Sequence, residues 1–124
     1  VDEQVLDQFE AALAEITKTH AWVGQIEYES LFSRPPTHFP NDMLALIELA
    51  CTRACNNASL AAPLRMTSGA FHDAMYLAEH CPTAMIFVPS KGGVSHNAAE
   101  DTAPQELFLG VQALAYVVTS LANA

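Results

Sequence analysis

The feature that most constrains the fold of this chain is a proline-rich segment, Ser33–Asp42, with the sequence SRPPTHFPND. Its three prolines lack the backbone N–H that helix interiors and central strands need, so the segment can be neither. The residues on its two sides should therefore form separate blocks of secondary structure. We predict a domain boundary here, between residues 1–36 and residues 37–124.

The part before the prolines predicts one helix and one strand. Apolar residues recur at helical spacing from Val5 to Ile16, which indicates an amphipathic helix ending near Thr19–His20. From Trp22 to Glu29 the pattern changes to alternation. Alternation of this kind is typical of a strand with one face in water.

The part after the prolines predicts an α/β fold. A helix should run from Asn41, as its N-cap, to about Asn57, and a shorter one from Phe71 to His80. The run TAMIFVP, Thr83–Pro89, is continuously apolar and of strand length. Such a run predicts a strand buried on both faces, as in the parallel part of an α/β sheet.

A last helix should follow, opened by a capping-box pattern at Thr102–Gln105 with Pro104 in its first turn. We expect its buried side to carry seven residues: Leu107, Phe108, Val111, Leu114, Ala115, Val118 and Leu121.

Composition narrows the classes of partner. Fourteen acidic residues against five basic ones give a net charge of −9, which disfavours binding to nucleic acid or to an anionic membrane surface. No uninterrupted apolar run reaches the roughly 18–20 residues of a membrane span. The first residues lack the features of a signal peptide, and the chain starts at the threshold of a helix, which suggests a fragment. Three cysteines in apolar surroundings are expected to be buried free thiols of a cytoplasmic protein: Cys51, Cys55 and Cys81.

Two polar clusters could carry chemistry. MTSGAFHDAM contains Ser68, His72 and Asp73 at a loop-to-helix junction, and GGVSHNAAED contains His96. His96 lies just beyond the predicted buried strand, at the sheet edge where α/β proteins bind ligands. Each histidine can equally be structural, His72 as a helix-start residue and His96 as a solvated loop residue. Asp73 adjoins His72 and would face elsewhere, so a Ser68/His72/Asp73 triad is unfavourable.

The stretch MTSGAFHDAMYLAEHCPTAMIFVPSKGGVSHNAAEDTAPQEL resembles the C-terminal signature of the hydantoinase/carbamoylase family of amidases, which includes N-carbamoyl-L-amino-acid hydrolases and allantoate amidohydrolases. This family belongs to the dinuclear-metal aminoacylase/carboxypeptidase superfamily. The resemblance implies that residues 37–124 are the C-terminal part of a zinc-peptidase-like, three-layer α/β/α catalytic domain. It implies that residues 1–36 are the last helix and strand of an α+β lid or dimerisation domain.

The resemblance also implies site residues. His96 matches a ligand of a site for two divalent metal ions, zinc or manganese, and His72 matches the histidine that polarises the substrate amide. Four further polar residues are expected to bind substrate or to support these two: Ser68, Asp73, Asn97 and Glu100. The implied enzyme is a cytoplasmic homodimer acting on a small ureido or N-carbamoyl substrate.

The chain departs from the family pattern at Phe71, where glycine is usual, and at Ala98 and Gly92. Because it offers one family metal ligand, we expect the isolated chain to be inactive and to hold no metal tightly. Two alternatives stay open: an aminoacylase or peptidase of the same superfamily, and a degenerate non-catalytic assembly domain, which Phe71 would suit.

Overall fold

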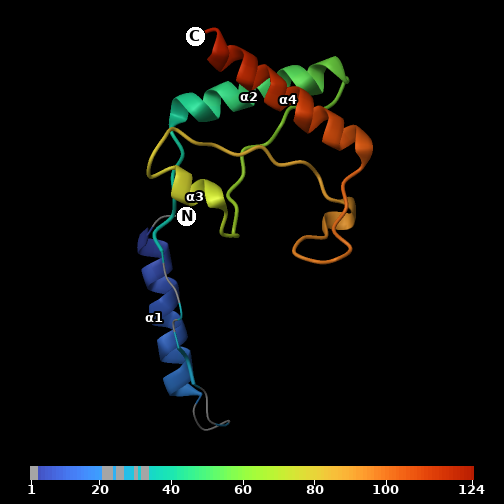
Figure 1. Cartoon of the computed structure of the whole chain (residues 1–124). Helices are drawn as coiled ribbons and strands as arrows, with labels where there is room; N and C mark the ends of the chain where they lie inside the picture. The colour runs from blue at the N-terminus through green and yellow to red at the C-terminus, as the bar shows by residue number, and fades with distance from the viewer. Residues whose placement is uncertain (1–2, 21–23, 25–26, 30, 32–33) are drawn as a thin grey trace. The chain divides into compact units, whose positions relative to one another are not determined.

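The computed structural model describes residues 3–20, 24, 27–29, 31 and 34–124, and the chain divides into two units, Val1–His38 and Phe39–Ala124 (Figure 1). The first unit contains helix α1, and the second contains α2, α3, the short 3-10 helix η1 and α4. No strand forms among the described residues. The assignment of the first unit to a lid domain stays a prediction.

Helix α1 spans Glu3–Thr19, as its apolar spacing predicts. Glu3 in its first turn and Lys18 in its last turn both complement the helix dipole. None of its residues is buried, and Val5, Phe9 and Ile16 of its apolar stripe are half or more exposed. The strand predicted at Trp22–Glu29 lies partly outside the described residues, and the described positions within it form no strand.

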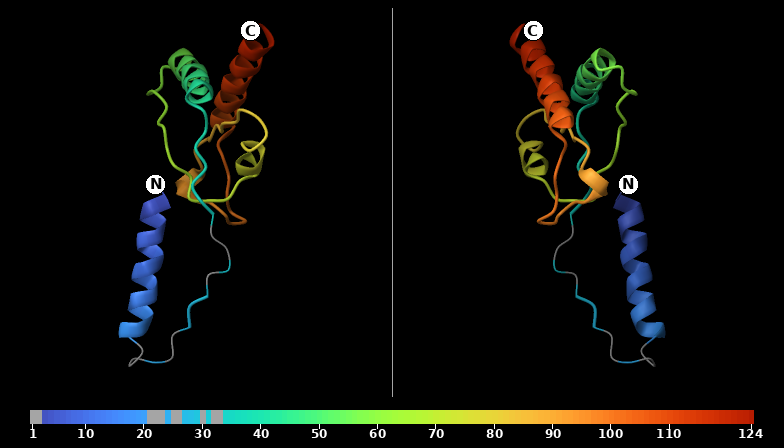
Figure 2. Two further views of the ribbon diagram at one scale, coloured as in Figure 1. Left: turned by 90° about the vertical axis from the view of Figure 1, so that its left-hand side faces the viewer. Right: turned by 90° about the vertical axis from the view of Figure 1, so that its right-hand side faces the viewer.

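Two helices, α2 (Asn41–Asn57) and α4 (Pro104–Ala122), lie side by side at one end of the second unit (Figure 1, Figure 2). Their contact buries four small or medium side chains: Ala50, Ala54, Ala113 and Val117. Small residues let the two backbones approach closely. At the edge of the pair, Asn57 Nδ2 donates a hydrogen bond to Tyr116 Oη at 3.1 Å, and the Arg53 guanidinium lies 4.3 Å from the Tyr116 ring centroid.

The starts of these helices differ from the predicted caps. Pro40, with φ −58° and ψ 139°, is the N-cap of α2, so Asn41 is already helical. Ala103 is the N-cap of α4, and no side chain caps either helix. The capping box predicted at Thr102–Gln105 is therefore absent. Pro104 instead begins α4, because its fixed φ suits a first turn that needs no N–H.

The buried side predicted for α4 is wrong. Six of the seven expected residues are about half exposed or more: Leu107, Phe108, Val111, Leu114, Val118 and Leu121. Ala115 is exposed too, while Ala113 and Val117 face α2. The spacing identified an apolar stripe correctly, but in the described structure the helix buries a different stripe against its neighbour.

By length and composition alone, α4 is apolar enough to cross a membrane, with a mean hydropathy of 1.2, although it contains no uninterrupted apolar run of that length. An uninterrupted run contains apolar residues only, whereas the mean hydropathy of a window in the helix also includes the polar residues between them. A core helix of a soluble protein passes the same test.

The strand predicted at Thr83–Pro89 is also wrong for the described structure: its residues are half-buried or exposed and belong to no strand. A strand needs a hydrogen-bonded neighbour, and the described residues supply none. The segment instead packs on α4, where a Cβ added at Gly110 would lie 2.6 Å from Val88 Cγ1. Helix α3, Asp73–Leu77, is shorter than the predicted Phe71–His80.

The cysteines are free, as expected, but they are not fully buried: Cys51 and Cys55 are half-buried and Cys81 is exposed. Burial raises the pKa of the Cys51 thiol, and the neighbouring Cys55 raises it further.

The described helices are compatible with the helical layers of an α/β domain.

Candidate functional site

The first polar cluster forms a hydrogen-bonded pair. Ser68 Oγ lies 2.7 Å from His72 Nε2, and both side chains are half-buried. The backbone N–H of Ala70 donates to Ser68 Oγ at 3.2 Å. The His72 ring meets the Phe87 ring edge-on, with centroids 5.5 Å apart and planes at 62°. The imidazole is therefore held both by a hydrogen bond and by an aromatic contact.

The backbone explains how Ser68 and His72 meet. His72 is the N-cap of α3 and has an extended conformation, with φ −133° and ψ 151°. Asp73 is the first residue of α3, where a carboxylate favours the helix dipole. Its side chain takes no part in the Ser68–His72 hydrogen bond, as the argument against a triad predicts. Phe71 is 62% exposed, so it fills no core position in the described structure.

The second polar cluster is a loop closed at its neck. The Lys91 N–H donates to the Asp101 carbonyl at 2.8 Å, and the Lys91 ammonium forms an ion pair with the Asp101 carboxylate. The Ser90 hydroxyl donates to the Val94 carbonyl inside the neck. The hydrogen bond from Lys91, followed by its charge, lowers the pKa of Asp101. These contacts join the two ends of the loop.

Inside the loop, His96 has a left-handed backbone with φ 54°, which is uncommon for a residue other than glycine. Glu100 stabilises this conformation, because its Oε2 accepts the His96 backbone N–H at 2.8 Å. Asn97 Oδ1 accepts the Ala99 N–H at 2.9 Å, and the Glu100 N–H donates to the Asn97 carbonyl at 2.9 Å. Asn97 and Glu100 therefore shape the loop that presents the exposed His96 ring.

The loop before α3 and the loop between η1 (Lys91–Gly93) and α4 both lie on the side of the second unit away from the α2–α4 pair (Figure 1, Figure 2). The hydrogen bonds of His72 and those of His96 stay within their own clusters in the described part of the chain. No group of three or more potential metal-binding side chains is present among the described residues. The described residues by themselves therefore do not make a complete metal site.

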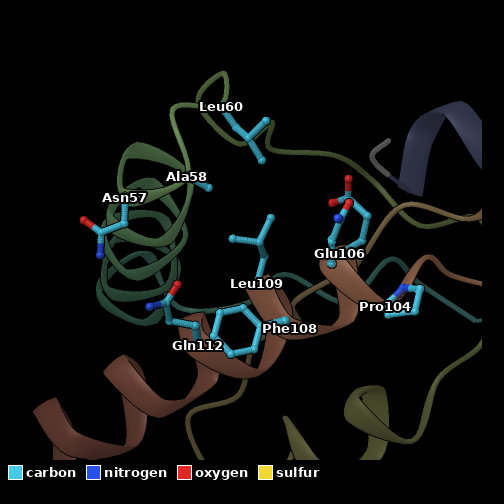
Figure 3. Close-up of a pocket in the computed structure, with 9 residues that line it drawn as sticks. Asn57, Ala58, Leu60, Pro104, Glu106, Phe108, Leu109 and Gln112 are labelled. Atoms are coloured by element: carbon cyan, nitrogen blue, oxygen red, sulfur yellow. The ribbon is translucent and has the colours of Figure 1, made fainter.

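A pocket of ≈ 600 Å³ lies elsewhere, between the end of α2 and the start of α4 (Figure 3). Leu60, Phe108 and Leu109 line its middle, with the Asn57 amide at one end and Glu106 at the other. None of the predicted site residues lines it. No sequence pattern predicts this pocket, because it arises from how the two helix ends meet.

The sequence profile described as Peptidase family M20/M25/M40 matches residues 3–120, which include both histidine clusters. An allantoate amidohydrolase from Escherichia coli (strain K12) is 36% identical over 97 residues, which make up 78% of this chain and 22% of that protein. An allantoate amidohydrolase from Bacillus subtilis (strain 168) is 47% identical over 57 residues, 46% of this chain and 14% of that protein.

An N-carbamoyl-L-amino acid amidohydrolase from Geobacillus stearothermophilus is 39% identical over 78 residues, 63% of this chain and 19% of that protein. The chain thus aligns with about a fifth or less of the length of these relatives. No solved structure matches it significantly. The resemblance to carbamoylase-type amidases is confirmed, and this chain belongs to Peptidase family M20/M25/M40.

Proposed function

We propose that the chain is the C-terminal part of a metal-dependent amidohydrolase that cleaves a carbon–nitrogen bond of a small N-carbamoyl or ureido compound. The observation that carries this proposal is the family match over residues 3–120, which takes in both histidine clusters. The names of the allantoate and N-carbamoyl-L-amino acid amidohydrolases support the substrate class.

His72 is the catalytic group in this proposal. Its half-buried ring, fixed by Ser68 and Phe87, can donate an N–H to the substrate carbonyl oxygen. Hydrolysis moves negative charge onto this oxygen, and a donor already in place stabilises that charge without reorganising. The two contacts on the ring support this role, because they fix the direction of the donor before substrate arrives.

His96 supplies one imidazole ligand to the divalent metal ions, zinc or manganese, and the other ligands come from residues outside this chain. Members of the M20 family generally bind divalent metals, which supports the proposal. When bound, such ions polarise a carbonyl and lower the pKa of a coordinated water. Asn97 and Glu100 hold the backbone that carries His96, so the point from which its ring projects is fixed. Asp73 is proposed to bind substrate or to support His72.

The decisive experiment compares the complete enzyme with the 124-residue chain. We expect the complete enzyme to release ammonia or a free amino acid from allantoate or N-carbamoyl-L-amino acids. We expect the chain alone to bind zinc weakly and to show no turnover. Tight, stoichiometric zinc binding together with turnover by the chain alone would contradict the proposal that it is one part of a larger site.

A second candidate is an aminoacylase or peptidase, which the name of the matched family favours. Assays with N-acyl amino acids and dipeptides beside the ureido substrates distinguish the two candidates. Hydrolysis of the N-acyl amino acids or dipeptides alone would identify an aminoacylase or peptidase. A non-catalytic assembly domain would hydrolyse neither class. We further propose that the complete enzyme is a cytoplasmic homodimer, joined through the domain to which residues 1–36 belong.

A further inference from the structure

The hydroxyl of Ser68 has a limited set of partners, and these restrict the state of His72. A serine hydroxyl carries one proton to donate and two lone pairs to accept. The Ala70 N–H donates to Ser68 Oγ at 3.2 Å and occupies one lone pair. The remaining contact described for the hydroxyl is His72 Nε2, at 2.7 Å. Either Ser68 donates to Nε2, or Nε2–H donates to Ser68.

The two directions differ in how well the groups are satisfied. If Ser68 donates, the chain Ala70 N–H to Ser68 O–H to His72 Nε2 runs in one direction, and each hydrogen bond polarises the next. If Nε2–H donates, Ser68 accepts twice and its own proton has no partner among the described residues. The site is half-buried, where an unused donor is unfavourable. The first arrangement is therefore favoured.

We infer that Ser68 is a positioning residue, which donates to Nε2 and holds neutral His72 in the tautomer with its proton on Nδ1. The working atom of His72 is then Nδ1, since Nε2 is already engaged. The edge-on contact with Phe87 limits rotation of the ring and thus fixes the direction of Nδ1–H. The catalytic consequence rests on the proposed function of His72, whereas the tautomer itself does not.

The tautomer can be measured without any assay of activity. The protein has five histidines, so ¹⁵N-histidine labelling with detection of two-bond ¹⁵N–¹H couplings gives a tractable spectrum. The His72→Gln variant identifies the His72 signals. At pH above 8 we expect a protonated Nδ1 and an unprotonated Nε2. Ser68→Ala should shift the ring toward the Nε2–H form, and Ser68→Thr, which keeps the hydroxyl, should restore the original pattern.

Ser120→Ala is the matched control, because it removes a hydroxyl from the exposed surface of α4, where Ser120 Oγ donates to the Tyr116 carbonyl of its own helix. It should leave the His72 signals unchanged. A protonated Nε2 in the unmodified protein would overturn the inference, as would a Ser68→Ala variant with unchanged His72 signals. Labelling of Ser68 by a fluorophosphonate would also overturn it, because Ser68 would then be a nucleophile.

Kinetics of the complete enzyme test the catalytic consequence separately. Ser68→Ala should lower kcat about tenfold with little change in KM, which corresponds to losing one hydrogen bond that orients the donor. Ser68→Thr should recover most of the rate. If the tautomer is as inferred but His72→Ala keeps full turnover, the proposed role of His72 fails while the positioning by Ser68 stands. If kcat falls in Ser68→Ala without a change of tautomer, the inference fails instead.

Discussion

Replacing Gly110 with alanine tests the packing of the Thr83–Pro89 segment on α4. A Cβ at position 110 would lie 2.6 Å from Val88 Cγ1, closer than two carbons can come without displacement. Val88 is stiff about χ1, so its methyl group cannot easily turn away. The clash should cost about 1–3 kcal/mol of unfolding free energy, as overpacking usually does. Alanine is also a better helix former than glycine by about 1 kcal/mol.

The two effects have opposite signs, and a second substitution separates them. In the unmodified background, Gly110→Ala should destabilise the protein by about 1 kcal/mol, the overpacking cost less the helix gain. In a Val88→Ala background the clash is absent, so the same change should stabilise by about 1 kcal/mol. The coupling energy between the two positions is then about 2 kcal/mol. Two positions that are not in contact would show a coupling of only about 0.3–0.5 kcal/mol.

Urea unfolding of the four proteins, followed by far-UV circular dichroism, gives the four free energies. The sign reversal between backgrounds is the result to look for, because it does not depend on the absolute stability. If Gly110→Ala stabilised the protein equally in both backgrounds, the close approach of Val88 to α4 would not exist in solution.

Three further outcomes follow from the two clusters. In the complete enzyme, the His96→Ala variant should lose one metal ion and nearly all activity while the fold stays intact. Elemental analysis measures the metal content. Unchanged metal content and rate would show that His96 is not a ligand. His72→Ala should keep its metal but lower kcat by about 10²–10³, with a smaller effect for Asp73→Asn; near-normal turnover would make His72 structural. The lowered pKa of Asp101 means that its contribution to stability is full above its ordinary value of 3.8 and is lost as pH falls through the folded value. Both side chains are exposed, so the effect should be small: Lys91→Met should slightly reduce the fall of the unfolding midpoint as pH drops below 3.8. An unchanged profile would show that the ion pair contributes no stability.

The helices were the predictable part of the fold. Helix α2 ends at Asn57, as predicted, and begins at Asn41, one residue before the predicted start, because its periodic apolar residues lie between the prolines and a turn. The caps were less predictable, since Pro40 and Ala103 hold N-cap positions that no side chain fills. Local sequence determines where a helix can exist more firmly than it determines which residue ends it.

The strand at Thr83–Pro89 and the buried face of α4 could not be predicted in the same way. Both predictions were made from apolar residues alone, and burial depends on neighbours as much as on the apolar residue itself. The seven apolar positions predicted on α4 form a surface that a neighbouring element could bury. In the described structure α2 instead buries Ala113 and Val117.

For the candidate site, the sequence suggested candidate residues but not their contacts. It placed Ser68 and His72 in one cluster and argued correctly that Asp73 would not orient His72. It did not anticipate that Ser68 would meet Nε2, because that contact depends on the extended backbone of His72 before α3. The left-handed backbone of His96 was equally hidden, since it is stabilised by a hydrogen bond to the side-chain carboxylate of Glu100.

The four-residue contact between α2 and α4 has a thermal consequence. The heat capacity of unfolding grows with the apolar surface that unfolding newly exposes to water, and it is about 1.2–1.5 kcal/mol/K for an ordinary domain of 100 residues. Here only Ala50, Ala54, Ala113 and Val117 are buried apolar residues in the described structure, and large side chains such as Phe108 are already hydrated. The heat-capacity change of unfolding should thus be small for this chain. Its free energy of unfolding should therefore vary almost linearly with temperature.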